Sequence, residues 1–112
     1  MKTKRICLIC PIRGDGQPGR VEENMRKAID WKVRMSGDGV ESIVPFLVLR
    51  EVLDDSIPEH REAGLAAGRA IMGTCHEAHV VLFGQEVSEG MQGDIDFLKR
   101  KGIPVVWGEE KQ

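Results

Sequence analysis

Long hydrophobic runs are absent from this sequence. Its apolar stretches end after a few residues, far short of the ~20 that a helix needs to cross a membrane, and no small-residue cleavage site follows the basic amino terminus. Internal repeats and low-complexity tracts are absent as well. We therefore expect no membrane partner, no signal peptide and a single domain over residues 1–112.

Cysteine is scarce, and neither sign of charge dominates. Three cysteines are an odd number for a disulfide scaffold and fit a reducing compartment, so the sequence predicts a cytoplasmic protein. Sixteen lysines and arginines stand against 18 aspartates and glutamates, a formal net charge of −2. Proteins that hold the nucleic-acid backbone carry a basic surface. We therefore expect no nucleic-acid partner.

The sequence contains an alternation of short apolar runs and segments with helical spacing. The runs are nearly continuous and end at glycine or proline, which is typical of strands buried on both faces. Strands of this kind separated by helices favour a parallel sheet. We predict an α/β fold, a doubly wound Rossmann-like (flavodoxin-like) parallel sheet of four to five strands with helices on both faces. The expected strands are 6–10, 40–46, 78–84 and 102–107, and the expected helices are 20–36, 56–71 and 88–101.

The predicted helices carry recognisable end signals. Ser56 precedes Glu59 by three residues in a capping-box pattern. Pro58 fits the first turn of the helix, because the main-chain N–H that proline lacks has no intrahelical partner there. Ser88 is the expected cap of the last helix, whereas residues 47–57 show no clear period. In the first helix, the residues that recur at helical spacing are Val21, Met25, Ala28, Ile29 and Lys32.

Ligands of doubly wound sheets bind beyond the carboxyl ends of the strands, at loops that lead into helices. The first such loop, residues 11–16, is rich in glycine, which exposes main-chain N–H groups, and Arg13 adds a fork of donors for a phosphate or carboxylate. The glycines within 14–19 match a dinucleotide-binding spacing, but Pro18 lies before any helical pattern, which disfavours that function. An ordinary exposed connection is the alternative.

A second such loop leads into the last predicted helix, at residues 88–94. At about 100° per residue, Asp94 falls inside the apolar arc of this helix beside Leu98, whereas Asp96 faces the opposite way. A carboxylate on a core-facing stripe must be paired, hydrogen-bonded or protonated, and such an acid is a candidate functional residue. The alternatives are that Asp94 reaches water at the margin of the sheet or pairs with a lysine such as Lys101.

The cysteines and histidines do not favour a metal site or a redox motif. Cys7 and Cys10 form a C-x-x-C pattern, but residues i and i+3 of a strand point to opposite faces and cannot easily hold one ion. A redox pair would be expected at the start of a helix. We expect no metal and no cofactor, with the cysteines packed as apolar residues. The residues that could be combined with Cys7 and Cys10 into a zinc site are Cys75, His76 and His79.

The order of motifs is a strand, an Ile-Arg-Gly loop and a helix, then Ser-x-Gly-x-x-x-acid at the start of a helix that leads to Gly-Ile-Pro-Val. With residues 53–59, 61–65 and 83–91, these motifs make the chain resemble the nucleoside 2-deoxyribosyltransferase superfamily. It is similar also to the 2'-deoxynucleoside 5'-phosphate N-hydrolases within that superfamily, and above all to small bacterial and phage members. The resemblance covers nearly the whole chain.

The resemblance implies an enzyme that hydrolyses the N-glycosidic bond of a nucleoside or nucleotide, or transfers its deoxyribosyl group. Asp94 would be the carboxylate nucleophile that attacks the anomeric carbon and forms a covalent glycosyl-enzyme. Sites in the superfamily commonly borrow residues from a neighbouring subunit, so a homo-oligomer is implied as well. The positions that would bind the sugar or 5'-phosphate are Ile12, Arg13, Gly14, Ser88, Glu89, Gly90 and Met91.

Departures from the superfamily pattern leave a second function open. The usual nucleophile is glutamate, which is one methylene longer than Asp94, and the chain contains no tyrosine, which many members use to orient the nucleophile. The second carboxylate of the family falls at Gly68. Glu62 is the nearest acid on that helix and Asp55 precedes its cap, but neither matches. The alternative function is a non-catalytic nucleotide-binding module with the same pocket. A purely structural or interaction domain is a third.

Overall fold

The computed structural model describes residues 3–13, 16–49, 54 and 56–108 of the chain. Strands and helices alternate through these residues, because the apolar runs end at turns and the intervening segments are amphipathic. None of the helices in this described part has both the length and the apolar character to span a bilayer. The elements are β1 (Lys4–Ile9), α1 (Arg20–Met35), β2 (Val40–Ile43), α2 (Pro45–Leu49), α3 (Pro58–Met72), β3 (Glu77–Val80), α4 (Glu89–Arg100) and β4 (Val105–Trp107).

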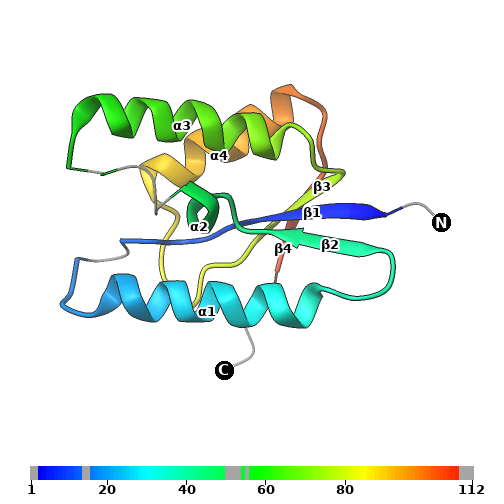
Figure 1. The fold of residues 1–112 in the computed structure, drawn as a ribbon, viewed down its shortest axis with the longest axis horizontal. Helices are drawn as coiled ribbons and strands as arrows, with labels where there is room; N and C mark the ends of the chain where they lie inside the picture. Colours follow the sequence, from blue (N-terminus) through cyan, green and yellow to red (C-terminus); the bar gives the residue numbers. More distant parts are fainter. Residues whose placement is uncertain (1–2, 14–15, 50–53, 55, 109–112) are drawn as a thin grey trace.

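The four strands form one parallel sheet in the order β2-β1-β3-β4, which confirms the predicted fold class. In the central strand, Cys7 pairs with Ile43 of β2 and with Ala78 of β3. Helix α1 covers one face of the sheet, and α3 and α4 cover the other (Figure 1). Because the chain leaves β1 toward β2 and later returns on the other side at β3, a topological switch point lies between β1 and β3.

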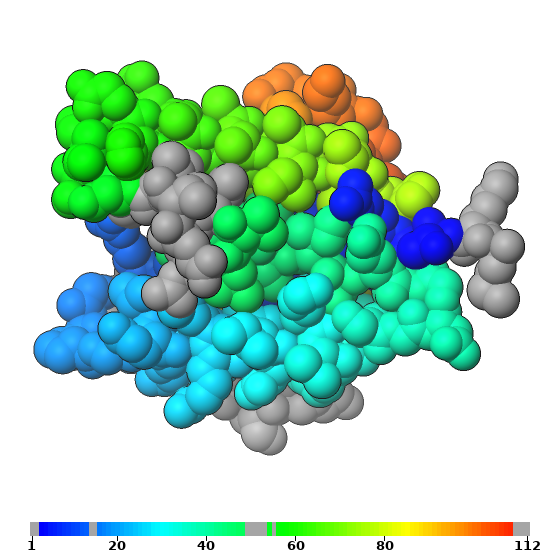
Figure 2. All heavy atoms as spheres, in the orientation of Figure 1, coloured from blue at the N-terminus to red at the C-terminus, as the bar shows by residue number. Residues whose placement is uncertain are grey.

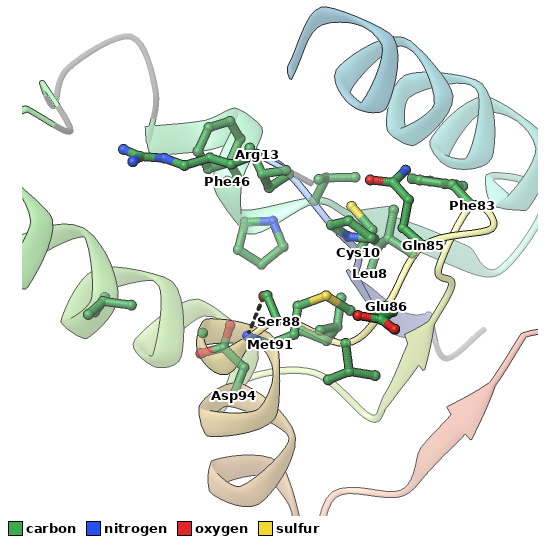
Figure 3. A pocket seen from close by; sticks show the side chains of 18 of the residues that line it. Leu8, Cys10, Arg13, Phe46, Phe83, Gln85, Glu86, Ser88, Met91 and Asp94 are labelled. Carbon is green, nitrogen blue, oxygen red and sulfur yellow. Dashed lines mark hydrogen bonds between the residues drawn. The ribbon is translucent and has the colours of Figure 1, made fainter. Parts of the chain in front are cut away.

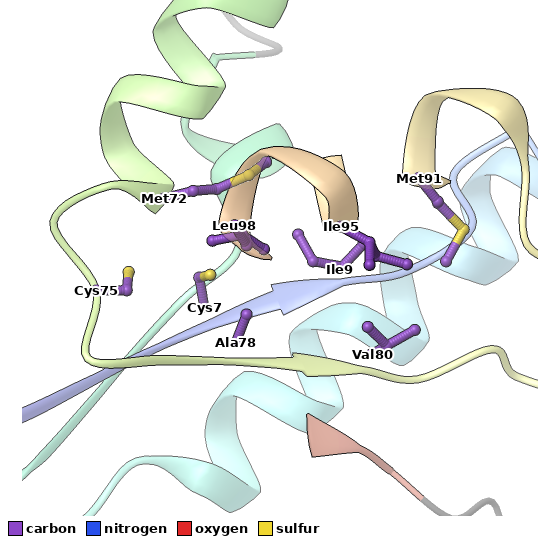
Figure 4. Packing of buried hydrophobic residues seen from close by; sticks show 9 residues of the cluster. All are labelled: Cys7, Ile9, Met72, Cys75, Ala78, Val80, Met91, Ile95 and Leu98. Carbon is purple, nitrogen blue, oxygen red and sulfur yellow. The ribbon is translucent and has the colours of Figure 1, made fainter. Parts of the chain in front are cut away.

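Side chains alternate between two hydrophobic clusters, one on each face. Ile6, Leu8 and Cys10 face α1, where they pack with Ala28 and Trp31 among others. The residues between them in β1 face α3 and α4. Cys7 and Cys10 therefore lie on opposite faces, as predicted. The second cluster, drawn in Figure 4, comprises Cys7, Ile9, Met72, Cys75, Ala78, Val80, Met91, Ile95 and Leu98.

Helix α1 has nearly the predicted limits, but its buried face is not fully the one suggested by the apolar spacing. Ile29 belongs to that spacing and is 46% exposed, whereas Ala28 is fully buried. The remaining buried positions of the helix are Asn24 and Trp31. The core face of α1 therefore includes the polar residue Asn24, whose side chain is hydrogen-bonded.

Two predicted strands are too long. The run 40–46 is a strand only to Ile43, because Pro45 begins the short helix α2 in a position where its missing N–H is harmless. The run 78–84 is a strand only to Val80. Phe83 then adopts a φ of 53° and Gly84 a φ of 74°, which turns the chain toward α4.

The two predicted serine caps have different outcomes. Ser88 caps α4, since its Oγ accepts a hydrogen bond of 3.2 Å from the main-chain N–H of Met91. The capping box at α3 is wrong: the N-cap residue is Ile57, which makes no side-chain cap. Ser56 instead donates its hydroxyl to Asp54 Oδ1 at 2.7 Å, so the hydroxyl is already engaged in a local turn.

Candidate functional site

A cavity of about 810 Å³ opens at the carboxyl ends of β1 and β3. Its volume is in the range of small-molecule binding sites. Figure 2 shows the surface hollowed between the beginning of α3 and the segment that leads into α1. Four parts of the chain supply the described lining: 8–13 with Arg20, 44–46, residues of α3 between 61 and 72, and 83–94.

Six of the eight predicted site residues line this one cavity. They come from the loop after β1 and from the start of α4, which are far apart in the sequence. Gly14 lies outside the described residues, and Glu89 is exposed at the first position of α4 and does not line the cavity. The six are Ile12, Arg13, Ser88, Gly90, Met91 and Asp94.

The amino terminus of α4 faces the cavity. Ser88 lies at this end and Asp94 follows six residues later on the same helix, while Arg13 and Phe46 lie across the cavity (Figure 3). The first turn of a helix leaves main-chain N–H groups without intrahelical partners and carries the positive end of the helix dipole. Met91 is 5% exposed and anchors this turn in the core. The turn therefore offers fixed donors to an anionic or hydroxylated ligand.

Asp94 is partly buried, and its partner comes from α3. The side chain is 19% exposed, and Arg69 Nε donates to Asp94 Oδ1 at 3.3 Å. Burial raises the pKa of Asp94 above that of an ordinary aspartate, and the guanidinium of Arg69 opposes this shift. The predicted alternative partner, Lys101, instead lies 5.9 Å from the centre of the Phe97 ring.

The contact between Arg69 and Asp94 depends on a glycine. A Cβ atom at Gly93 would lie 2.9 Å from a terminal nitrogen of Arg69, so the missing side chain leaves room for the guanidinium. The guanidinium also lies over the Phe97 ring, 5.9 Å from its centre. Sequence reasoning missed Arg69. Two features of the sequence could have indicated this contact: an arginine on the amphipathic helix α3, and a glycine directly before the aspartate on α4.

Positive side chains outnumber negative ones around the cavity. The described lining includes Arg13, Arg20 and Arg61, and its acids are Asp94 and Glu86. Arg20 also contacts Glu23 at 3.3 Å. A surplus of guanidinium groups beside a helix amino terminus suits a phosphate or carboxylate.

The other walls of the cavity are apolar. Phe46 enters from α2, an element that was not predicted, and Leu65 enters from α3. Phe83 is 8% exposed in the turn after β3, and its ring lies 5.7 Å from Lys27 Nζ. These side chains give the cavity a surface on which a flat ring can pack.

The thiols do not supply a nucleophile to this cavity. Cys10 lines it, but burial raises the pKa of its thiol to about 12, so it stays protonated. Cys7 and Cys75 lie in the same core cluster and outside the described cavity lining, and their interaction lowers the pKa of Cys75 and raises that of Cys7. In the described part of the chain, no three cysteine, histidine or acidic side chains come together in a way that would hold a metal ion.

The superfamily's second carboxylate has no counterpart in the described lining on α3. Glu62 is exposed and lies outside the lining, and Gly68 is buried. Asp55 lies outside the described residues. Of the acids that do line the cavity, Glu86 is exposed and Asp94 is the partly buried one.

The fold and the cavity define a parallel α/β protein of the Rossmann-like class with a ligand-sized cavity at its topological switch point. Within that class, the model of a family described as a domain of unknown function (DUF7768) matches residues 4–107, and the chain belongs to this family. The comparison with curated proteins gives no match.

Proposed function

We propose that this protein cleaves the N-glycosidic bond of a 2'-deoxynucleoside or its 5'-monophosphate, with Asp94 as the nucleophile. One observation carries the proposal above the others. The partly buried carboxylate of Asp94 lines the same cavity as Ser88 and Arg13, although the three residues come from two distant segments. The resemblance to deoxyribosyltransferases assigns the same carboxylate to this step.

The chemistry needs one oxygen of Asp94 to be available. Arg69 holds Oδ1, which leaves Oδ2 to attack the anomeric carbon of the sugar. The new C–O bond forms as the C–N bond breaks, and the base leaves with the electron pair and then takes up a proton. Water adds to the same carbon in the second step and releases the sugar from Asp94, or a second base does so and is thereby glycosylated.

The neighbouring groups fit the rest of such a substrate. Ser88 uses an oxygen lone pair for the N–H of Met91, so its own hydroxyl hydrogen is available to a sugar hydroxyl or a phosphate oxygen. Arg13 and Arg61 supply charge for a 5'-phosphate, and Phe46 supplies an apolar surface for the base.

A second candidate function is nucleotide binding without turnover. The contact of Arg69 with Asp94 favours it, because a guanidinium withdraws charge from the attacking carboxylate. The absence of tyrosine from the chain favours it too, since no phenol can orient the acid. In this function the cavity and its arginines would be the same, and Asp94 would be a ligand contact.

The experiment that tests the proposal follows release of free base by chromatography from the common 2'-deoxynucleosides and their 5'-monophosphates. Asp94→Asn should lower the rate by at least about 10³-fold, since it removes the nucleophile and keeps the shape of the side chain. The matched control is Asp96→Asn, two residues along the same helix. Asp96 is exposed and accepts a hydrogen bond from Gln92, so its loss should leave the rate unchanged.

Other outcomes separate the two candidates. Binding by calorimetry with no base released, and no gain from Asp94→Glu, would support the non-catalytic module. Absence of both binding and turnover would reject both functions. The homo-oligomer implied by the resemblance remains part of the proposal, and sedimentation equilibrium measures it.

A further inference from the structure

Asn24 is a fully buried polar residue on α1, and its carboxamide joins three segments of the chain. Its Nδ2 donates to the main-chain oxygen of Ile12 at 3.0 Å and to Gln85 Oε1 at 3.2 Å. Its Oδ1 accepts a hydrogen bond of 2.7 Å from Gln85 Nε2. Asn24 therefore connects α1 to the loop after β1 and to the turn after β3, and both of these line the cavity.

The main-chain carbonyl of Ile12 determines the orientation of both carboxamides. The oxygen and nitrogen of an amide side chain are assigned from their hydrogen-bond partners. A carbonyl oxygen only accepts, so Asn24 must turn its nitrogen toward Ile12. Gln85 must then turn its oxygen toward that same nitrogen and its own nitrogen toward Asn24 Oδ1. Reversing the two amides together would place two oxygens against each other at Ile12.

This orientation gives the two sides of the Gln85 carboxamide different polarity. Each partner uses one N–H and one oxygen lone pair in the reciprocal pair, so Gln85 keeps a second lone pair on Oε1 and a second hydrogen on Nε2. In Figure 3 the oxygen lies on the side of Cys10 and the nitrogen lies on the side of Phe83, so the spare lone pair and the spare hydrogen are directed toward different walls of the cavity. The turn that carries Gln85 is closed by its main-chain N–H, which donates to Leu82 at 2.9 Å.

We propose that Gln85 determines specificity by presenting Oε1 as a fixed acceptor, and that Asn24 is the residue that positions it. The cavity would then select ligands with an amino group at this wall over ligands with a carbonyl oxygen there. An amino group donates to Oε1, whereas a carbonyl oxygen would oppose it and leave two acceptors unpaired. This inference rests on the proposed function, since it takes the ligand to be a nucleoside or nucleotide.

The test compares two matched pairs of 2'-deoxynucleoside 5'-monophosphates, cytidine against uridine and adenosine against inosine. The ring atoms are the same within each pair, and an amino group in the first member is replaced by an oxo group in the second. Dissociation constants are measured by calorimetry with the wild-type chain, and again with Asp94→Asn to exclude turnover. We expect the amino member to bind roughly tenfold more tightly in at least one pair.

Variants of the two amides show whether the pair acts on specificity. Gln85→Met should reduce the tenfold ratio to within about twofold while the affinity for the oxo member stays within about threefold. Asn24→Asp should reduce the ratio similarly, because a carboxylate cannot donate to Ile12 or to Gln85 and the orientation is lost. The matched control is Gln92→Met, an exposed glutamine of α4 outside the cavity lining, which should preserve the ratio.

Each outcome has a defined meaning. If Gln85→Met weakens both members of a pair equally, the amide pair is a structural connection and the inference is wrong. A wild-type ratio near one in both pairs overturns the inference and leaves the proposed function intact, whereas failure to bind any nucleotide overturns both. Should Gln85→Met not fold, Asn24→Leu combined with Gln85→Met removes both polar partners, and the same ratio is read from it.

Discussion

The two ends of the sheet carry similar types of charged residue in different arrangements. At the amino end, acids and bases contact each other directly: Lys4 Nζ lies 2.7 Å from Glu77 Oε1, and Arg5 Nε lies 2.7 Å from Glu41 Oε1. At the carboxyl end, arginines from three elements or loops surround a cavity whose described lining contains two acids.

At the amino end the charged groups support the fold, whereas at the carboxyl end they line a cavity that can hold a ligand. Partly exposed ion pairs like those at the amino end stabilise a protein by roughly 0–1 kcal/mol each. A cavity with an excess of positive charge gains far more from an anionic ligand than from its own few acids. We therefore expect substitutions at the carboxyl end to change binding and those at the amino end to change stability.

The largest effect in this comparison should come from Arg13. Arg13→Ala should weaken binding of a 2'-deoxynucleoside 5'-monophosphate roughly tenfold and binding of the nucleoside without phosphate much less. Lys4→Ala, at the amino end, is the control and should leave both dissociation constants unchanged. Calorimetry at two salt concentrations measures them. Equal weakening by the two variants would mean that general electrostatics, rather than the cavity, attracts the ligand.

A smaller and more specific effect is expected from Gly93→Ala. The new methyl group would occupy space used by the end of the Arg69 side chain, which is flexible and can move away. Alanine also favours a helix by roughly 1 kcal/mol over glycine. We therefore expect a slightly higher melting temperature together with a several-fold slower release of base. The matched control is Gln92→Ala, which also places an alanine on α4, at an exposed position outside the cavity lining.

If Gly93→Ala slows base release no more than Gln92→Ala does, then Arg69 has no positioning role for Asp94. Gln92→Ala should change the melting temperature little, because glutamine and alanine both favour a helix.

The smallest effect concerns the pH dependence of stability, which should have opposite signs at the two ends. Hydrogen bonds from Lys4 and His79 lower the pKa of Glu77, whereas burial raises that of Asp94. Because the pKa of Glu77 is lower in the folded protein than in the unfolded chain (~4.3), Glu77 stabilises the fold at pH values above ~4.3. This stabilisation is lost as the pH falls. Because the pKa of Asp94 is higher in the folded protein than in the unfolded chain (~3.9), Asp94 stabilises the fold at pH values below ~3.9. This stabilisation is lost as the pH rises.

Denaturant unfolding between about pH 3 and pH 6 measures both groups. Glu77→Gln should reduce the rise of the unfolding free energy with pH, and Asp94→Asn should make that rise steeper, each by less than about 1 kcal/mol. A change of the same sign in both variants would contradict the assignment of the two acids.

The order of elements could be predicted because strand and helix signals in this chain are local. Continuous apolar runs that end at proline or glycine located β1 and β4, and the position of Ser88 located the start of α4. The fold class followed from their alternation. Local signals failed where two of them competed: Pro45 ended an apolar run that otherwise continued, and Ser56 had Asp54 within reach as an alternative to the helix N–H groups.

The candidate site could be predicted in part. The position of Asp94 on the apolar arc of its helix follows from a period of 3.6 residues, so its partial burial was accessible from the sequence. The partners of the buried polar groups could not be predicted from the sequence, because Arg69 is 25 residues from Asp94 and Asn24 is 61 residues from Gln85. Such pairs depend on how helices pack on the sheet, which no local pattern specifies.

The most direct test of the central claim is to look for the covalent intermediate. The protein would be mixed with a 2'-deoxynucleoside 5'-monophosphate that it cleaves, quenched in acid during turnover, digested with pepsin and examined by mass spectrometry. We predict a deoxyribosyl phosphate ester on Asp94, absent from the Asp94→Asn variant, with Asp96 unmodified. Steady release of base with no adduct on Asp94, and an undiminished rate in Asp94→Asn, would contradict the account.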